Sequence, residues 1–163
     1  MSLSRTWRHL LATRWSLRRA FNASVLTAIE DAIRTTESTH GGEVRVAVEN
    51  ELEFPALWRG VTSRDRALEA FSQLRVWDTE LNNGVLIYVL WADRRVEIVA
   101  DRAFKTLVSD QEWRDVCASM EAAFSAHRPG DALVSGIQAV GALIARHFPA
   151  TDRNELPDRP VLM

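Results

Sequence analysis

The run Val85–Trp91 constrains the fold of this chain more than any other segment. It contains seven consecutive apolar residues, of which five are β-branched or aromatic. Such a run is typical of a strand that is covered on both faces, because a half-exposed strand alternates apolar and polar side chains. It is far shorter than the ~20 residues that a membrane-spanning helix requires. We therefore expect a central strand with helices on both sides of its sheet.

The segments that flank this run predict a mixed sheet. Asn82-Asn83-Gly84 is a turn signal before the run, and Asp93-Arg94 turns the chain into a second strand at residues 96–100. These two strands form a β-hairpin. Alternating valines predict an earlier strand at residues 44–48. Residues 50–60 are expected to form a loop that tucks Leu57 and Trp58 inward.

Apolar residues with a 3.6-residue period predict four helices, at 22–36, 63–76, from Ser109 onward and from Pro129 to Pro149. Ser109 and Glu112 have the spacing of a capping box. The inner face of the second helix is expected to carry Ala67, Leu68, Phe71 and Leu74. A strand–helix–strand crossover covers one sheet face, and the apolar strand requires cover on the other. The expected fold is therefore an α/β protein, a three-layer α/β/α sandwich with a small mixed sheet that contains a β-hairpin.

The length and composition fit one folded domain with two extensions. The chain has 163 residues and 47% hydrophobic residues, which argues against disorder. We divide it into a basic, aromatic N-terminal arm (residues 1–21), a domain (22–148) and a flexible, polar, proline-rich tail (149–163).

The arm allows two interpretations. Arginines alternate with tryptophans and leucines, and most apolar residues fall on one side of a helical wheel, although Arg14 and Arg18 interrupt that side. One interpretation is an interfacial helix, with peripheral membrane contact through residues 1–21. The other, which we favour, is an arm that packs on the domain or on a second subunit.

Several function classes are disfavoured by the sequence. A net charge of -2 gives no global field that recruits nucleic acid, so we expect no nucleic-acid partner. No GxSxG elbow and no Walker loop occur, and the single cysteine, Cys117, forms no intrachain disulfide. We interpret four tryptophans as packing residues and all four histidines as surface or helix-end residues (Trp58, Trp77, Trp91, Trp113; His9, His40, His127, His147).

A cluster of carboxylate and amide groups is expected at one end of the hairpin. Asp78, Glu80, Asn82 and Asn83 precede the central strand, and Asp101 follows the second strand. Antiparallel pairing places the start of one strand beside the end of the other, so Asp101 should approach the asparagines. Calcium and magnesium prefer such oxygen ligands, and a bound ion could polarise a phosphate. The alternative is that the asparagines only form the turn and Asp78 caps or pairs with an arginine.

Four segments, in this order, resemble the TPM domain family. Residues 43–48 look like its first strand, 82–87 like its Asn-Gly turn and apolar strand, and 93–98 like its hairpin. Phe124, with Gly130-Asp131 and Gly136-Ile137, is similar to its closing helical pair. The resemblance covers roughly residues 22–148 and implies a sandwich fold.

The resemblance also implies a range of functions. Members are linked to photosystem repair, thylakoid acid phosphatase activity, calcium binding and membrane-associated complexes. Many carry a signal peptide and a C-terminal membrane helix. This chain shows neither and adds the arm, so we expect a cytoplasmic location, peripheral on the inner membrane face.

From these observations we expect a binding or scaffold module that holds a divalent cation, calcium or magnesium, and acts with an unknown protein partner near a membrane complex. The cation ligands would be Asp78, Asn82, Asn83 and Asp101. The alternative is a metal-dependent acid phosphatase that uses the same ligands and acts on phosphomonoesters. We favour the binding module because the sequence reveals no nucleophile or general base for a hydrolase.

Overall fold

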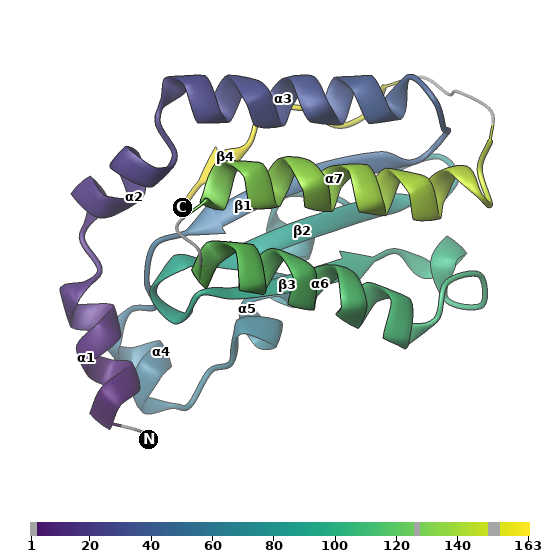
Figure 1. Ribbon diagram of the computed structural model, residues 1–163. Helices are drawn as coiled ribbons and strands as arrows, with labels where there is room; N and C mark the ends of the chain where they lie inside the picture. Colours follow the sequence, from purple (N-terminus) through teal and green to yellow (C-terminus); the bar gives the residue numbers. More distant parts are fainter. Residues whose placement is uncertain (1–2, 126–127, 150–153) are drawn as a thin grey trace.

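The computed structural model describes residues 3–125, 128–149 and 154–163. Over these residues, a four-stranded sheet in the order β3-β2-β1-β4 lies between two layers of helices (Figure 1). β1 runs parallel to β2 and to β4, whereas β2 and β3 form an antiparallel hairpin. The predicted three-layer sandwich with a mixed sheet is confirmed. The strands are β1 (Glu43–Glu49), β2 (Gly84–Leu90), β3 (Arg95–Ala100) and β4 (Val161–Leu162).

Strand β2 is buried along its whole length, as its apolar sequence predicts. Its alternate side chains enter two separate hydrophobic cores, one on each face of the sheet. The first core lies under α3 (Ala23–Glu37), α6 (Asp110–Ser125) and α7 (Pro129–Ala145). The second is covered by α4 (Phe54–Trp58) and α5 (Ser63–Gln73). Trp91 leaves the strand and begins a short 3-10 helix, η1 (Trp91–Asp93).

Local sequence signals explain the helix ends and the close packing in the first layer. The predicted capping box before α6 is confirmed, because the Ser109 N–H donates to Glu112 Oε2 at 2.9 Å and the Glu112 N–H donates to Ser109 Oγ at 3.3 Å. Helices α3 and α7 approach closely at Gly141. A Cβ at this position would lie 1.7 Å from Thr36 Oγ1, so glycine is required there. Over the described residues, no helix combines the length and the hydrophobicity needed to span a bilayer.

The prediction for the second helical layer was partly wrong. Residues 54–58 form α4, with a proline in its first turn, where we expected only loop. Trp58 and Leu68 are 69% and 48% exposed rather than inward. In each helix the preceding residue, Leu57 or Ala67, is buried as predicted. Neighbouring helical side chains point about 100° apart, so only one of each pair can face the sheet.

The C-terminal segment 154–163 carries structure where the sequence predicts a flexible tail. Its β4 adds an edge strand to β1, and the Met163 N–H donates to Val48 O at 2.9 Å. Buried polar side chains of β1 bind the same segment: Arg45 donates to two of its backbone carbonyls and Glu43 accepts one of its N–H groups. These contacts attach the segment to the sheet. Residues 150–153 of the predicted tail lie outside the described residues.

Candidate functional site

The predicted cation cluster lies where β2 begins and β3 ends. Val85 is opposite Ala100 in the hairpin register, so the preceding turn runs beside the segment that follows β3. The Asp101 N–H donates to Gly84 O at 2.9 Å, and the Ala103 N–H donates to Asn82 O at 3.2 Å. These backbone bonds hold Asp101 next to the asparagine pair, as antiparallel pairing predicts.

The Asn82-Asn83-Gly84 sequence fits the backbone of this turn. Asn82 has a φ of 53°, a left-handed conformation that asparagine tolerates better than most residues. Gly84 is required for a different reason, because a Cβ at this position would lie 2.0 Å from Val76 O. Asparagine and glycine therefore suit these two positions of the turn, which places the asparagine pair at the end of the sheet.

Two oxygens of the cluster are buried without a hydrogen-bond partner. Asn83 is 1% exposed, and its Nδ2 donates to Gly41 O, yet its Oδ1 accepts nothing from the described residues. Asp101 Oδ1 accepts the Arg102 N–H at 2.7 Å, while its buried Oδ2 has no donor among those residues. A buried acceptor without a donor costs about 1–3 kcal/mol. Such oxygens therefore indicate positions that an ordered water or a cation would occupy.

The other two predicted ligands are engaged with arginines. The Asp78 carboxylate lies 2.7 Å from Arg75 Nη2, and both side chains are largely exposed. Asn82 Oδ1 accepts a hydrogen bond from Arg102. The turn thus joins Asn82, Asn83 and Asp101, whereas Asp78 forms the arginine pair that the alternative interpretation describes. In the described part of the chain, no three His, Cys, Asp or Glu residues gather as a metal site.

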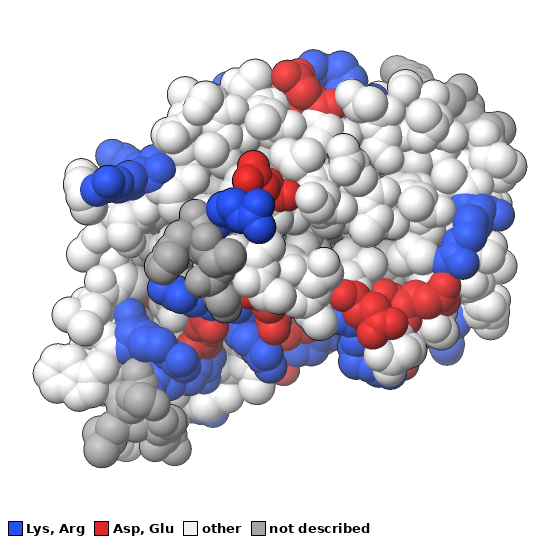
Figure 2. All heavy atoms as spheres, viewed as in Figure 1, with Lys and Arg blue, Asp and Glu red and all other residues white. Residues whose placement is uncertain are grey.

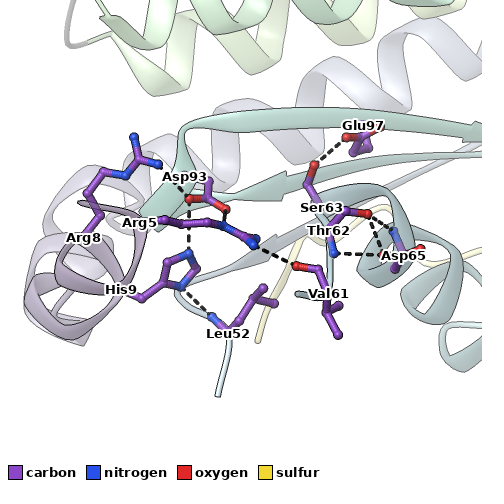
Figure 3. Close-up of polar contacts among 10 residues, drawn as sticks. All are labelled: Arg5, Arg8, His9, Leu52, Val61, Thr62, Ser63, Asp65, Asp93 and Glu97. Carbon is purple, nitrogen blue, oxygen red and sulfur yellow. Dashed lines mark hydrogen bonds and ion pairs between the residues drawn. The ribbon is translucent and has the colours of Figure 1, made fainter. Parts of the chain in front are cut away.

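The opposite end of the hairpin holds the N-terminal arm (Figure 3). The arm forms α1 (Leu3–Leu11) and α2 (Arg14–Ala20). In η1, the Asp93 carboxylate accepts hydrogen bonds from Arg5 Nε at 2.8 Å and from Arg8 Nη2 at 3.3 Å. Burial would raise the pKa of Asp93, but its contacts with His9 and Arg5 outweigh burial and lower it. The arm therefore packs on the domain, which is one of the two interpretations that its sequence allows.

Two of the histidines that we interpreted as surface or helix-end residues are buried: His9, in the last turn of α1, and His40, which follows α3. His9 is 3% exposed and His40 is 1% exposed. His9 Nδ1 accepts the Leu52 N–H at 2.9 Å, and His40 Nδ1 accepts the Gly42 N–H at 3.2 Å. Both rings therefore satisfy backbone donors, a role that residue type and spacing do not reveal. His127 lies outside the described residues.

A surface cavity of about 560 Å³ opens between the arm and the hairpin tip, but its charges are largely paired. Arg5 and Arg8 contact Asp93, and Arg95 contacts Glu121 at 3.1 Å. The cavity thus resembles a set of ion pairs between the arm and the domain more than an open catalytic site. The cysteine is also unsuited to catalysis, because burial raises the pKa of Cys117 to about 11 and keeps the thiol protonated.

Comparisons with known proteins agree with the geometry. Residues 18–143 match the family model of the TPM domain. The NMR structure of the BA42 protein from the psychrophilic bacterium Bizionia argentinensis is similar, with 33% identity, a TM-score of 0.76, and coverage of 87% of this chain and 94% of that chain.

Two further NMR structures share the fold alone. The N-terminal domain of a P. gingivalis protein has 18% identity and a TM-score of 0.64, with 82% of each chain covered. The N-terminal domain of the cg2496 protein from Corynebacterium glutamicum has 15% identity and a TM-score of 0.54, with 82% of this chain and 77% of that chain covered. A search of curated proteins gave no significant match.

Proposed function

Because the chain belongs to the TPM domain family, we propose that it is a non-catalytic binding module that holds a divalent cation and works beside a membrane. One observation carries the cation part of the proposal. Asn83 Oδ1 and Asp101 Oδ2 are both buried acceptors without a donor among the described residues, and both lie at the same end of the hairpin.

The ligand chemistry favours calcium. Calcium accepts carboxylate, amide, backbone and water oxygens in irregular arrangements, whereas magnesium demands a near-ideal octahedron. Asn82, Asn83 and Asp101 would supply one carboxylate and two amide oxygens. Calcium would also have to displace the Arg102 guanidinium from Asn82 Oδ1. Because the site carries so little negative charge, its dissociation constant should be on the order of millimolar.

Calcium titration followed by ¹H–¹⁵N NMR tests this assignment. The amide signals of Asn83, Gly84 and Asp101 should shift together and saturate at millimolar calcium. Asp101→Asn keeps a side-chain cap for Arg102 but removes the charge, so it should abolish the saturating shift. Asp115→Asn, at an exposed position on α6, is the matched control and should titrate like the parent chain. Equal shifts in the parent and Asp101→Asn would refute the site.

A metal-dependent phosphomonoesterase is the second candidate function, and Arg102 is the observation that favours it. Its exposed guanidinium lies against Asn82 at the edge of the cluster, where it could bind a phosphate beside the ion. Among the described residues, the protonated Cys117 thiol is a poor nucleophile, and the His9 and His40 Nδ1 atoms accept backbone N–H groups. The attacking group would therefore have to be a water molecule on the ion.

Turnover of p-nitrophenyl phosphate separates the two functions. The binding module predicts no turnover above background, with calcium, with magnesium or with EDTA. Turnover that EDTA abolishes, and that Asp101→Ala loses while Asp115→Asn retains it, would favour the phosphatase instead.

A further inference from the structure

Six large apolar side chains are exposed at the end of the molecule formed by α1, α2 and α4. Each is more than half exposed, which is unusual for so many side chains on neighbouring elements. We call this group the arm surface. Its members are Trp7 (61% exposed), Leu10 (64%), Leu11 (71%), Trp15 (68%), Phe54 (56%) and Trp58 (69%).

The arm surface is exposed although the arm itself is folded onto the domain. Leu17 and Phe21 of the arm are buried in the first core. Arg5 Nη1 donates to Val61 O at 3.0 Å, and the Leu52 N–H donates to His9, so α1 is bonded to both flanks of α4. Figure 1 shows α1 and α4 at the same end of the molecule. The exposed apolar side chains of α1 and α4 therefore lie at the same end of the molecule, on helices that these bonds hold in place.

Positive charge accompanies these apolar side chains. The arm sequence, residues 1–21, contains five arginines and no aspartate or glutamate. Arg14 and Arg18 are exposed and take part in none of the ion pairs of the described residues. Arg19 stacks over the Trp15 ring at 5.4 Å. Figure 2 shows blue side chains without red ones over the position of α2.

We propose that the arm surface binds the headgroup region of an anionic lipid bilayer. Tryptophan prefers the membrane–water interface, and helices with apolar and arginine-rich faces lie in that plane. The arginines would contact lipid phosphates while the apolar side chains enter the boundary with the acyl chains. A second copy of the chain fits this surface less well, because the two arms would bring their unpaired arginines together. This lipid binding rests on the proposed function, and it would specify its membrane part as contact with anionic phospholipids.

Vesicle co-sedimentation in EDTA tests the proposal without any contribution from calcium. The full chain should pellet with phosphatidylcholine vesicles that contain 30 mol% phosphatidylglycerol, on the order of tenfold more than with phosphatidylcholine alone. Arg14→Ser/Arg18→Ser should weaken binding by about fivefold for each arginine removed. Trp7→Ser/Leu11→Ser changes only exposed side chains and should weaken binding by at least about tenfold.

The matched control is Trp77→Ser, at an exposed tryptophan that follows α5, away from the arm. It should bind vesicles like the parent chain. Absence of binding to anionic vesicles, or equal binding by Trp7→Ser/Leu11→Ser, overturns the proposal. So does a dimer in sedimentation velocity that Trp7→Ser/Leu11→Ser converts to a monomer, because the surface would then be covered by a second copy. None of these outcomes depends on the cation cluster, so the membrane part and the cation part of the proposed function fail separately.

Discussion

The His9 ring lies between the backbone of Leu52 and the carboxylate of Asp93. Its Nδ1 accepts the Leu52 N–H at 2.9 Å, and its Nε2 lies 3.2 Å from Asp93 Oδ1, a polar contact without full hydrogen-bond geometry (Figure 3). Because Nδ1 is an acceptor, the ring proton is on Nε2 and faces the carboxylate. One buried side chain thus joins the arm, the loop before α4 and the tip of the hairpin.

His9→Ala should destabilise the chain by about 2–4 kcal/mol, because it leaves the Leu52 N–H without its acceptor and removes a buried ring. Arg8→Ala removes an exposed partner of the Asp93 carboxylate and should lower the free energy of unfolding by about 0.5 kcal/mol or less. Urea unfolding of the two variants measures both values. Equal stability of His9→Ala and Arg8→Ala would mean that the ring does not hold the arm.

Arg45→Met should release the C-terminal segment from β1. The Arg45 guanidinium donates to Pro157 O and, at 2.8 Å, to Arg159 O, and methionine retains most of the side-chain volume without these bonds. We expect hydrogen exchange at the Met163 amide to accelerate at least about tenfold, while the β2 amides keep their protection. Arg59→Met, at an exposed arginine, is the control. Unchanged protection of Met163 would show that β4 holds without Arg45.

Stability should depend on pH through Glu37. Burial raises its pKa from 4.5 to about 8, although Glu37 Oε1 accepts the Val44 N–H at 2.7 Å. Because the folded pKa lies above the unfolded value, the folded chain binds a proton that the unfolded chain has lost between pH 4.5 and pH 8. The contribution of Glu37 to the free energy of unfolding is therefore complete below pH 4.5. It declines as pH rises to 8, by at most about 1.4 kcal/mol per pH unit.

Glu37→Gln stays neutral at every pH and keeps the acceptor for Val44. Its free energy of unfolding, relative to the parent chain, should rise steadily from pH 4.5 to pH 8. Glu53→Gln, at an exposed residue that makes no side-chain cap bond, should follow the parent at every pH. A constant difference between Glu37→Gln and the parent would contradict the raised pKa.

Local patterns predicted β1, β2, β3 and most helices, because the signals for these elements lie within a few neighbouring residues. The apolar run 85–91 marked the central strand, and the Ser109–Glu112 spacing marked the start of α6. Strand β4 was not predictable in this way, since two residues carry no periodicity. The available signal was Arg45, a charged residue between the alternating valines of β1. A buried arginine there requires hydrogen-bond acceptors, which the C-terminal segment supplies.

The arrangement of the site residues was harder to predict, because it depends on contacts between segments that are distant in the sequence. Hairpin pairing was enough to bring Asp101 to Asn82 and Asn83, because register follows from the turn. It could not indicate that Asp78 turns to Arg75, since a flexible exposed side chain has several partners within reach. The buried state of His9 was equally hidden, because its partners Leu52 and Asp93 come from other parts of the chain.

Calcium binding measured by isothermal titration calorimetry is the most direct test of the proposed cation site. The parent chain should bind one calcium ion with a dissociation constant on the order of millimolar. Asp101→Ala removes the carboxylate that backbone bonds hold beside the asparagines, so it should give no binding heat. Asp78→Ala should bind like the parent because that side chain pairs with Arg75. No heat from the parent chain at 10 mM calcium, or equal heats from the parent and Asp101→Ala, would contradict the account.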